Sequence, residues 1–397
     1  MTLLTRPFEF DFDPGAIHYG RGCVVDIGAA LQRCSLQRAL IVCGSNLGAN
    51  RELMDRVEAG VDDRLVGVFD ETTPEKRLET VYDGVETMWR LDAEALVPVG
   101  GGSTLDIATA ICLLDADFRP FEETVQEVEE TGQIARSEDV ESVVPMLSVP
   151  TTLAGADLSI GGGVIVTDDG NHLEAALMDP TLMPSALFYD PTLFATTPID
   201  ALAGSAMNGF NKGLEAVYSQ FANPITDATA VRGLQYLRSS LPRLRQSDDP
   251  AVLDRAVAGI ILTQYGVSVP EAYKLSLVHA FGHALRKQFG IQQGIGHAII
   301  VPHALRLLFD QVDGRRDALA TGLEVDGDDT AGGIIDAVTA VRDGLGLPSR
   351  LRNVEGTSEA GIPAATDLVA EDFLLELGPP AFDPSLEEIE GVFREAW

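Results

Sequence analysis

The sequence predicts an α/β domain with a parallel sheet, followed by an all-helical domain. The chain has 397 residues, which is too long for one ordinary core. Short apolar runs alternate with segments of helical spacing in the first half, and this alternation is typical of a parallel sheet covered by helices. Strand signals stop near residue 195. We therefore expect an α/β dinucleotide-binding domain over residues 1–193 and a helical substrate or catalytic domain over residues 194–397.

The first half supplies the elements of the sheet in alternation. The run 38–45 ("RALIVCGS") is apolar, β-rich and ends in Gly-Ser, so it indicates a buried parallel strand. A proline near the start of 74–91 fits the first turn of a helix. Further strands are expected at 64–70, 95–103, 143–152 and 161–168, all extending one sheet, and helices at 49–61, 74–91 and 104–116.

The second half shows only helical spacing of its apolar residues. The segment 189–198 ("YDPTLFATTP") is a plausible joint between the two domains. The expected helices lie at 199–220, 225–244, 251–267, 274–289, 330–346 and 385–397.

The net charge of −33 arises from 61 acidic and 28 basic residues, and only four of the bases are lysines. A charge of this size destabilises the folded state by self-repulsion unless salt screens it. We infer a salt-rich cytoplasm, as in a halophile, with an ordinary acidic protein as the alternative. No basic patch for nucleic acid or an anionic membrane is visible. No secretory signal and no apolar run of roughly 18 residues is found, so a cytoplasmic protein is expected.

A glycine-rich turn joins an expected strand to an expected helix in "VPVGGGSTLDIATAI". Glycines let the backbone approach a ligand, and a helix N-terminus offers free N–H groups to phosphate. We place Gly100, Gly101, Gly102 and Ser103 at the pyrophosphate of a dinucleotide. A plain tight turn is the alternative, because the run is neither a GxGxxG fingerprint nor a Walker A loop.

A second polar cluster, "SVPTTLAGADLS", follows the apolar strand expected at 143–152. Thr151 and Thr152 can hydrogen-bond a ribose or a phosphate, although threonines at strand ends are often structural.

Three of the six histidines lie within residues 279–300. His279 and His283 are four residues apart, so on a helix they share one face, and His297 follows after a glycine-rich break. This pattern indicates part of a metal site.

The order of GGGS, PTT-x-AG, YDPTL, LEAVYS, VHAFGHAL and GHAIIVPHAL resembles the iron-containing alcohol dehydrogenase family, from about residue 15 to the C-terminus. That family shares its fold with dehydroquinate synthase and glycerol dehydrogenase. "SAMNGFNKGLEAVYS" and "GHAIIVPHAL" look most like its maleylacetate reductase branch. The resemblance implies an NAD(P)-dependent oxidoreductase acting on a small alcohol, aldehyde or keto acid, and a homodimer or larger homo-oligomer.

The resemblance also implies four metal-ligand positions, which hold an Asp and three His in the family. Here they are Asn208, Lys212, His279 and Gln293, so one ligand of four is kept. Neutral amides are poor ligands for iron or zinc, and an ammonium has no lone pair to donate. We therefore expect the metal to be absent and its site degenerate.

Lys212 stands where the resemblance places a metal-ligating histidine, so its ammonium is expected to polarise the substrate oxygen instead. His279, His283 or His297 is expected to supply or accept the proton. The alternative for Lys212 is a surface ion pair with Glu215, three residues further on the same helix.

Two departures from the family pattern concern the cofactor. Gly44 replaces an Asp that binds the adenosine ribose in many members, so Gly44, Ser45 and Asn46 would tolerate the 2′-phosphate of NADP as well as NAD. Asp106 follows the glycine run and is expected at the cofactor too, while Thr109 replaces a Lys. Two other functions stay open: a non-catalytic nucleotide-binding protein, and a lyase or synthase resembling dehydroquinate synthase.

Overall fold

The structure, a computed structural model, describes residues 7–168 and 171–397 and divides into two compact units. The α/β unit comprises Phe12–Thr152 and Ala156–Thr197. The helical unit comprises Pro198–Trp397, the short segment Leu153–Gly155 and the described residues up to Asp11. The main division falls close to the expected boundary at 193/194. The sequence pattern gave no sign that Leu153–Gly155 belongs with the helices.

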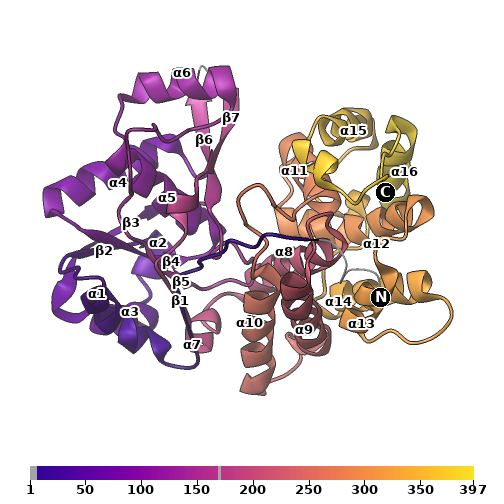
Figure 1. The fold of residues 1–397 in the computed structure, drawn as a ribbon, viewed down its shortest axis with the longest axis horizontal. Coiled ribbons are helices and arrows are strands. Elements are labelled where there is room, and N and C mark those ends of the chain that lie inside the picture. Colours follow the sequence, from indigo (N-terminus) through magenta and orange to yellow (C-terminus); the bar gives the residue numbers. More distant parts are fainter. Residues whose placement is uncertain (1–6, 169–170) are drawn as a thin grey trace. The chain divides into compact units, whose positions relative to one another are not determined.

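The α/β unit is built on a six-stranded sheet in the order β1-β8-β5-β4-β2-β3, and every neighbouring pair is parallel (Figure 1). The predicted parallel sheet is thereby confirmed. The strands β1 and β8, four residues each, were not predicted. The strand bounds are β1 (Ala16–Tyr19), β2 (Ala39–Gly44), β3 (Leu65–Thr72), β4 (Ala95–Gly100), β5 (Leu147–Pro150) and β8 (Ala186–Tyr189).

The sheet is buried on both faces because helices cover each side. The residues of β2 alternate between two apolar cores. Leu40 and Val42 face one core, whereas Ala39, Ile41 and Cys43 face the other. The first core contains residues of α4 and α5, and the second contains residues of α1 and α3, so the helices form two layers (Figure 1). The helices of this unit are α1 (Ile27–Arg33), α2 (Ser45–Gly48), α3 (Arg51–Val61), α4 (Leu78–Leu91), α5 (Gly102–Ala116), α6 (Phe121–Thr131) and α7 (Pro191–Phe194).

The strand expected at 161–168 forms, but it does not extend the sheet. It is β6 (Gly161–Asp168), which pairs antiparallel with β7 (Asn171–Met178) as a separate two-stranded sheet. Val164 and Val166 of this hairpin join the apolar core that contains α5. The hairpin therefore covers a helix that is apolar on nearly all sides, and a sequence pattern does not distinguish that role from a sheet strand.

The helix expected at 74–91 begins at Leu78 instead. Lys76 has a φ of 51°, in the left-handed region, and Arg77 is extended, so neither residue continues a right-handed helix. Pro74 thus lies in a loop rather than in the first turn.

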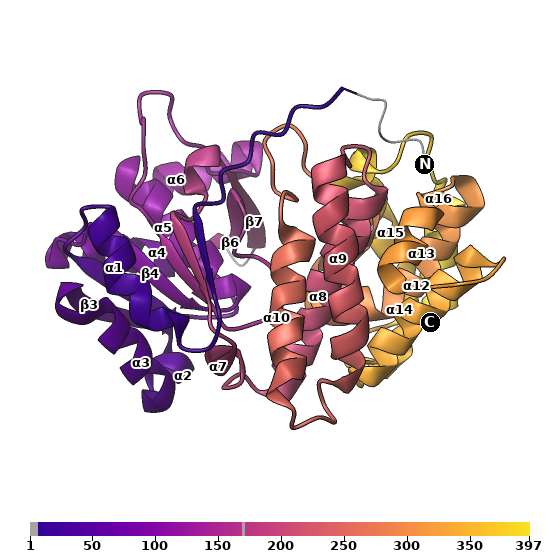
Figure 2. The same cartoon turned by 60° about the horizontal axis from the view of Figure 1, so that its bottom comes forward.

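The helical unit confirms the six predicted helices and adds three, α12, α13 and α15. Figure 2 shows α8, α9 and α10 lying along one another. Among the described residues, no helix is long and apolar enough to cross a membrane. The bounds are α8 (Ile199–Tyr218), α9 (Pro224–Ser240), α10 (Pro250–Gln264), α11 (Leu277–Phe289), α12 (Gln293–Gln311), α13 (Arg316–Leu323), α14 (Thr330–Gly344), α15 (Ile362–Ala370) and α16 (Leu386–Ala396).

Helix α8 lies at the centre of this unit, with 15 of its 20 residues buried. Its glycines allow close approach of other backbone segments. A Cβ at Gly209 would lie 2.3 Å from the carbonyl oxygen of Leu153, and a Cβ at Gly294 of α12 would lie 1.9 Å from that of Gly204. Leu153 N–H also donates to Ser205 Oγ at 3.1 Å. These contacts explain why Leu153–Gly155 packs with the helices.

Candidate active site

Glu215 is a fully buried carboxylate that links α8 to the start of α11. Its Oε1 accepts hydrogen bonds from the backbone N–H groups of Ser276, Val278 and His279, at 3.1, 2.8 and 3.2 Å. Its Oε2 contacts Nδ1 of His279. The Glu215 side chain therefore accepts hydrogen bonds from three N–H groups at the start of α11 and orients the imidazole of His279.

Nε2 of His279 lies 3.1 Å from Oδ1 of Asn208 on α8. If His279 donates its Nδ1 proton to Glu215, Nε2 is an acceptor and the Asn208 amide turns its NH₂ toward it. If Glu215 carries the proton, His279 donates from Nε2 to Asn208. Both arrangements place one proton on the Glu215–His279 pair, and together with Asn208 the three side chains form a hydrogen-bonded chain.

The electrostatics of this pair favour a shared proton over full charge separation. Burial raises the pKa of Glu215 to about 7, although His297 and the backbone N–H groups act in the opposite direction. Burial lowers the pKa of His279 well below its usual value, and Lys212 and His283 lower it further. At neutral pH the His279 ring is therefore a neutral imidazole.

His297 packs against His279 with ring centroids 4.5 Å apart in an edge-to-face arrangement. It is fully buried, and neither ring nitrogen has a hydrogen-bond partner within the described chain. Gly282 of α11 makes room for it, since a Cβ there would lie 2.3 Å from His297 Nε2. Burial lowers the pKa of His297 well below its usual value, so this ring is also neutral at neutral pH.

His283 differs from the other two rings because it is partly exposed, with 29% of its side chain accessible. Its Nδ1 lies 2.8 Å from Oδ2 of Asp372. Burial of Asp372 opposes ionisation, but the bond from His283 keeps the pKa of Asp372 below its usual value. Sequence reasoning missed Asp372, which lies 89 residues from its partner and belongs to no recognisable pattern.

Lys212 lies on α8 one turn beyond Asn208, and its Nζ donates to the carbonyl oxygen of Gly155. The side chain is part-buried. The surface ion pair with Glu215, considered above as an alternative, does not describe this carboxylate, which is fully buried and bonded to α11 and His279.

The four positions that hold metal ligands in the family do not form a donor set for iron or zinc here. Asn208 and His279 face one another at hydrogen-bond distance, Lys212 is a cation, and Gln293 offers a neutral amide. Across residues 7–168 and 171–397, no group of three His, Cys, Asp or Glu side chains is placed to hold a metal ion.

The glycine run lies between β4 and α5 in the α/β unit, and its geometry requires glycine. A Cβ at Gly100 would lie 2.7 Å from Thr104 Oγ1, and a Cβ at Gly101 would lie 2.9 Å from Thr152 Cγ2. No described side chain caps the N-terminus of α5, which begins at Gly102. A backbone this bare at a helix start fits the pyrophosphate of a dinucleotide.

The other residues expected at the cofactor gather at the same edge of the sheet. Thr151 N–H donates to the Gly100 carbonyl at 2.9 Å, so the threonine pair lies beside the glycine run. Gly44 ends β2, where a Cβ would lie 2.9 Å from the carbonyl oxygen of Thr72, and Ser45 and Asn46 follow in α2. Carboxyl ends of parallel strands are the usual ligand edge of such sheets.

Asp106 lies one turn of α5 beyond Gly102 and forms an ion pair with Lys76, at 2.9 Å between Oδ2 and Nζ. Sequence reasoning included Asp106 but missed Lys76. Its only signal was the scarcity of lysine in the chain.

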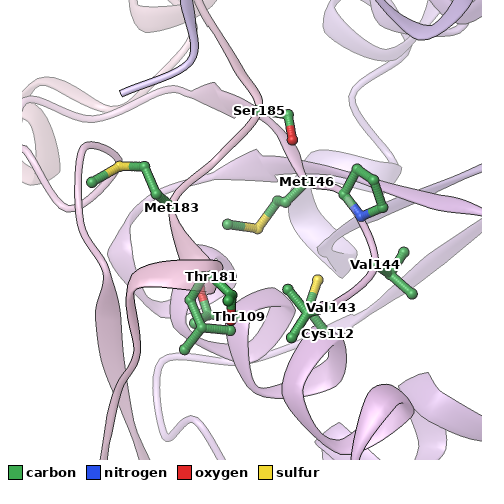
Figure 3. A pocket seen from close by; sticks show the side chains of 10 residues that line it. Thr109, Cys112, Val143, Val144, Met146, Thr181, Met183 and Ser185 are labelled. Carbon is green, nitrogen blue, oxygen red and sulfur yellow. The ribbon is translucent and has the colours of Figure 1, made fainter. Parts of the chain in front are cut away.

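A small pocket lies elsewhere in the α/β unit (Figure 3). Met146 and Ser185, which line it, directly precede β5 and β8, so it lies at the amino ends of these strands. Cys112 in its wall is buried, and burial raises the pKa of its thiol. The pocket is thus on the edge of the sheet opposite the glycine run.

A glycine run at the carboxyl edge of a parallel sheet is typical of an enzyme that binds a dinucleotide. The helical unit adds a hydrogen-bonded histidine cluster. The chain belongs to the iron-containing alcohol dehydrogenase family. The family's N-terminal model matches residues 14–191 and its C-terminal model matches residues 202–397.

The chain matches its relatives over three quarters or more of their length. It is 27% identical to an NAD-dependent methanol dehydrogenase of Bacillus methanolicus, over 97% of this chain and 99% of that one. It is 25% identical to a maleylacetate reductase of a Rhizobium species, over 76% of this chain and 75% of that one. A crystal structure of a 1,3-propanediol oxidoreductase has the same fold, with a TM-score of 0.86, 21% identity and coverage of 99% and 100%. The predicted family resemblance is confirmed.

Proposed function

We propose that this protein is an NAD(P)-dependent oxidoreductase that acts on a small alcohol, aldehyde or keto acid without a metal. The observation that carries the proposal is the replacement of the family's donor set by a cation, Lys212, beside the hydrogen-bonded chain of Glu215, His279 and Asn208. The full-length likeness to an NAD-dependent alcohol dehydrogenase supports the reaction class. The acidic composition supports a salt-rich cytoplasm. The family likeness supports a homo-oligomer.

The α/β unit holds the dinucleotide in this proposal. Gly100 to Ser103 bind the pyrophosphate, and Thr151 and Thr152 bind an adjoining ribose or phosphate. Gly44, at the end of β2, leaves room for either an NAD ribose or the 2′-phosphate of NADP. When bound, the nicotinamide supplies or accepts the hydride.

Lys212 polarises the substrate oxygen. An ammonium carries three N–H donors, and the Gly155 carbonyl accepts from Nζ in the structure. In reduction of a carbonyl, negative charge develops on the oxygen, and a positioned cation stabilises that charge much as a Lewis acid does. Polarisation of the substrate oxygen is therefore the part of the metal's function that the Lys212 ammonium can replace.

The histidine cluster supplies or accepts the proton. His283 is the best candidate for direct exchange, because it is the partly exposed ring, and Asp372 fixes its Nδ1 and leaves Nε2 for a proton partner. A proton that moves between Glu215 and His279 changes the electrostatic potential at His283. His297 is the third candidate, with both nitrogens available.

Two other functions are less well supported. A non-catalytic nucleotide-binding protein would have no need for the buried hydrogen-bonded chain of Glu215, His279 and Asn208. A lyase or synthase of the dehydroquinate synthase type needs a metal and additional phosphate-binding bases. Arginines of the helical unit such as Arg315 and Arg306 are paired with carboxylates, and Lys274 is buried against the carbonyls of Gly266 and Ala272.

The test is Lys212→Ala, assayed for NADPH and NADH turnover with a panel of carbonyl compounds after chelation. Turnover should fall by about two to three orders of magnitude, the scale for loss of one electrostatic donor. Binding of the nucleotide should not change, because its phosphates lie in the other unit. Lys212→Arg should recover part of the loss, since a guanidinium keeps the charge but not the shape. Lys287, exposed on α11, provides the matched control as Lys287→Ala. Full activity of Lys212→Ala would rule out this role.

A further inference from the structure

Lys76 is the single lysine of the α/β unit, and it lies in the loop between β3 and α4. Its Nζ is 2.9 Å from Oδ2 of Asp106 on α5. Both side chains are largely buried, with 13% and 17% of their surface accessible. A buried ion pair in a chain with so few lysines calls for a reason beyond surface solubility.

The loop that carries Lys76 is held in an unfavourable backbone conformation. Lys76 is not a glycine, yet its φ is 51°. Its carbonyl accepts a hydrogen bond from Ile165 N–H of β6 at 2.8 Å. Gly162 of the same strand makes room for the pair, because a Cβ there would lie 2.8 Å from Asp106 Oδ1. The hairpin β6–β7 thus fixes this lysine against α5.

The pair lies close to the expected pyrophosphate site. Asp106 is four residues beyond Gly102, which is about 6 Å along the helix axis. Ser103, Asp106 and Thr109 are spaced by three residues, so they lie along one side of α5. A lysine at position 109, as in the family pattern, would reach Asp106 from within the helix. In this chain Lys76 reaches Asp106 from a different loop.

A carboxylate at this place would repel a pyrophosphate unless a cation neutralised it. Lys76 neutralises it with one N–H, and an ammonium has two further N–H donors. We propose that Lys76 is a cofactor-binding residue that donates a charged hydrogen bond to the dinucleotide pyrophosphate and offsets the charge of Asp106. This inference rests on the proposed function, since it requires a dinucleotide at the glycine run.

The experiment measures the dissociation constants of NADH and NADPH by fluorescence titration, at 0.5 M and 3 M KCl. Lys76→Met should weaken the binding of both nucleotides by about ten- to a hundredfold at the lower salt, the scale for loss of a charged hydrogen bond. The loss should shrink at 3 M KCl, because salt screens charge but does not restore a damaged loop. Lys76→Arg should bind nearly as the wild type, and Arg77→Gln, which removes an exposed neighbouring charge, is the matched control.

A double variant separates charge from structure. Lys76→Met with Asp106→Asn removes both charges, so it should bind more tightly than Lys76→Met alone. Binding unchanged in Lys76→Met, or a loss confined to NADPH, which would indicate the 2′-phosphate, overturns the assignment to the pyrophosphate. If Lys76→Met does not fold, weak binding by folded Lys76→Arg overturns it as well. Failure of the wild type to bind either nucleotide would instead refute the proposed function.

Discussion

Glu215 offers the sharpest test of how the histidine cluster is held, through the pair Glu215→Ala and Glu215→Gln. Alanine leaves the three buried N–H groups of Ser276, Val278 and His279 without their acceptor. Each buried donor left unpaired costs about 1–3 kcal/mol, and water admitted by the smaller side chain offsets part of the sum. We expect a loss of about 4 kcal/mol in the free energy of unfolding, in line with the 3–5 kcal/mol typical of breaking a buried pair.

Glutamine keeps an oxygen for the N–H groups and can donate its amide proton to His279 Nδ1. It should therefore cost only about 1 kcal/mol, while forcing His279 to carry its proton on Nε2. The assay is thermal unfolding of the full chain in 2 M KCl at pH 7, where about 4 kcal/mol corresponds to roughly 8–16 °C for a unit of this size. An alanine variant within 1 kcal/mol of the wild type, or a glutamine variant as unstable as alanine, would refute the reasoning.

A comparison of the wild type with Glu215→Gln gives a pH test with a defined sign. The pKa of Glu215 is raised in the folded state, from 4.5 to about 7. Its contribution to stability is therefore complete below the unfolded value and is lost as the pH rises through about 7. The stability of the wild type relative to Glu215→Gln should fall between pH 4.5 and 7. A constant difference over that range would contradict the raised pKa.

Three further predictions follow from the charge, the donor set and the packing. The melting temperature should rise with KCl from 0.1 M into the molar range, because screening relieves repulsion among 61 acids, and a flat profile would contradict the halophile reading. Protein purified without chelator should carry well under one equivalent of iron, zinc or nickel by elemental analysis, and a stoichiometric metal bound at His279 would restore a metal mechanism. Gly294→Ala places a Cβ 1.9 Å from the Gly204 carbonyl, so it should cost about 2 kcal/mol or more in thermal unfolding, whereas Gly391→Ala, with open space around it, should cost little.

The sheet, nine of the helices and the glycine run could be predicted from the sequence because each depends on local periodicity or on a turn. Short strands such as β1 (Ala16–Tyr19) escaped, since four residues are too few to show a pattern. The hairpin role of β6 (Gly161–Asp168) also escaped, because an apolar alternation does not say which layer a strand covers. Both segments needed the tertiary fold to be assigned.

The candidate site divides in the same way. His279 and Lys212 were found from motif positions, whereas Glu215 was considered only as a surface partner. Its burial depends on where α11 begins, and that start is a tertiary contact between residues 61 to 64 positions apart. Asp372 lies 89 residues from its partner His283, and Lys76 lies 30 residues from its partner Asp106. Side-chain pairs of this kind follow no fixed sequence spacing, so they can be identified only from the three-dimensional structure.

Helix α5 has no solvent face over most of its length, since ten of its 15 residues are buried between the sheet and the hairpin β6–β7. The glycine run therefore leads into a helix that is packed on both sides, rather than into a surface helix that can shift. An anion arriving there meets N–H groups already held in place, so little ordering entropy remains to be lost on binding. Binding of the dinucleotide should then leave the amide hydrogen exchange of α5 nearly unchanged, while the exposed loops around it slow down.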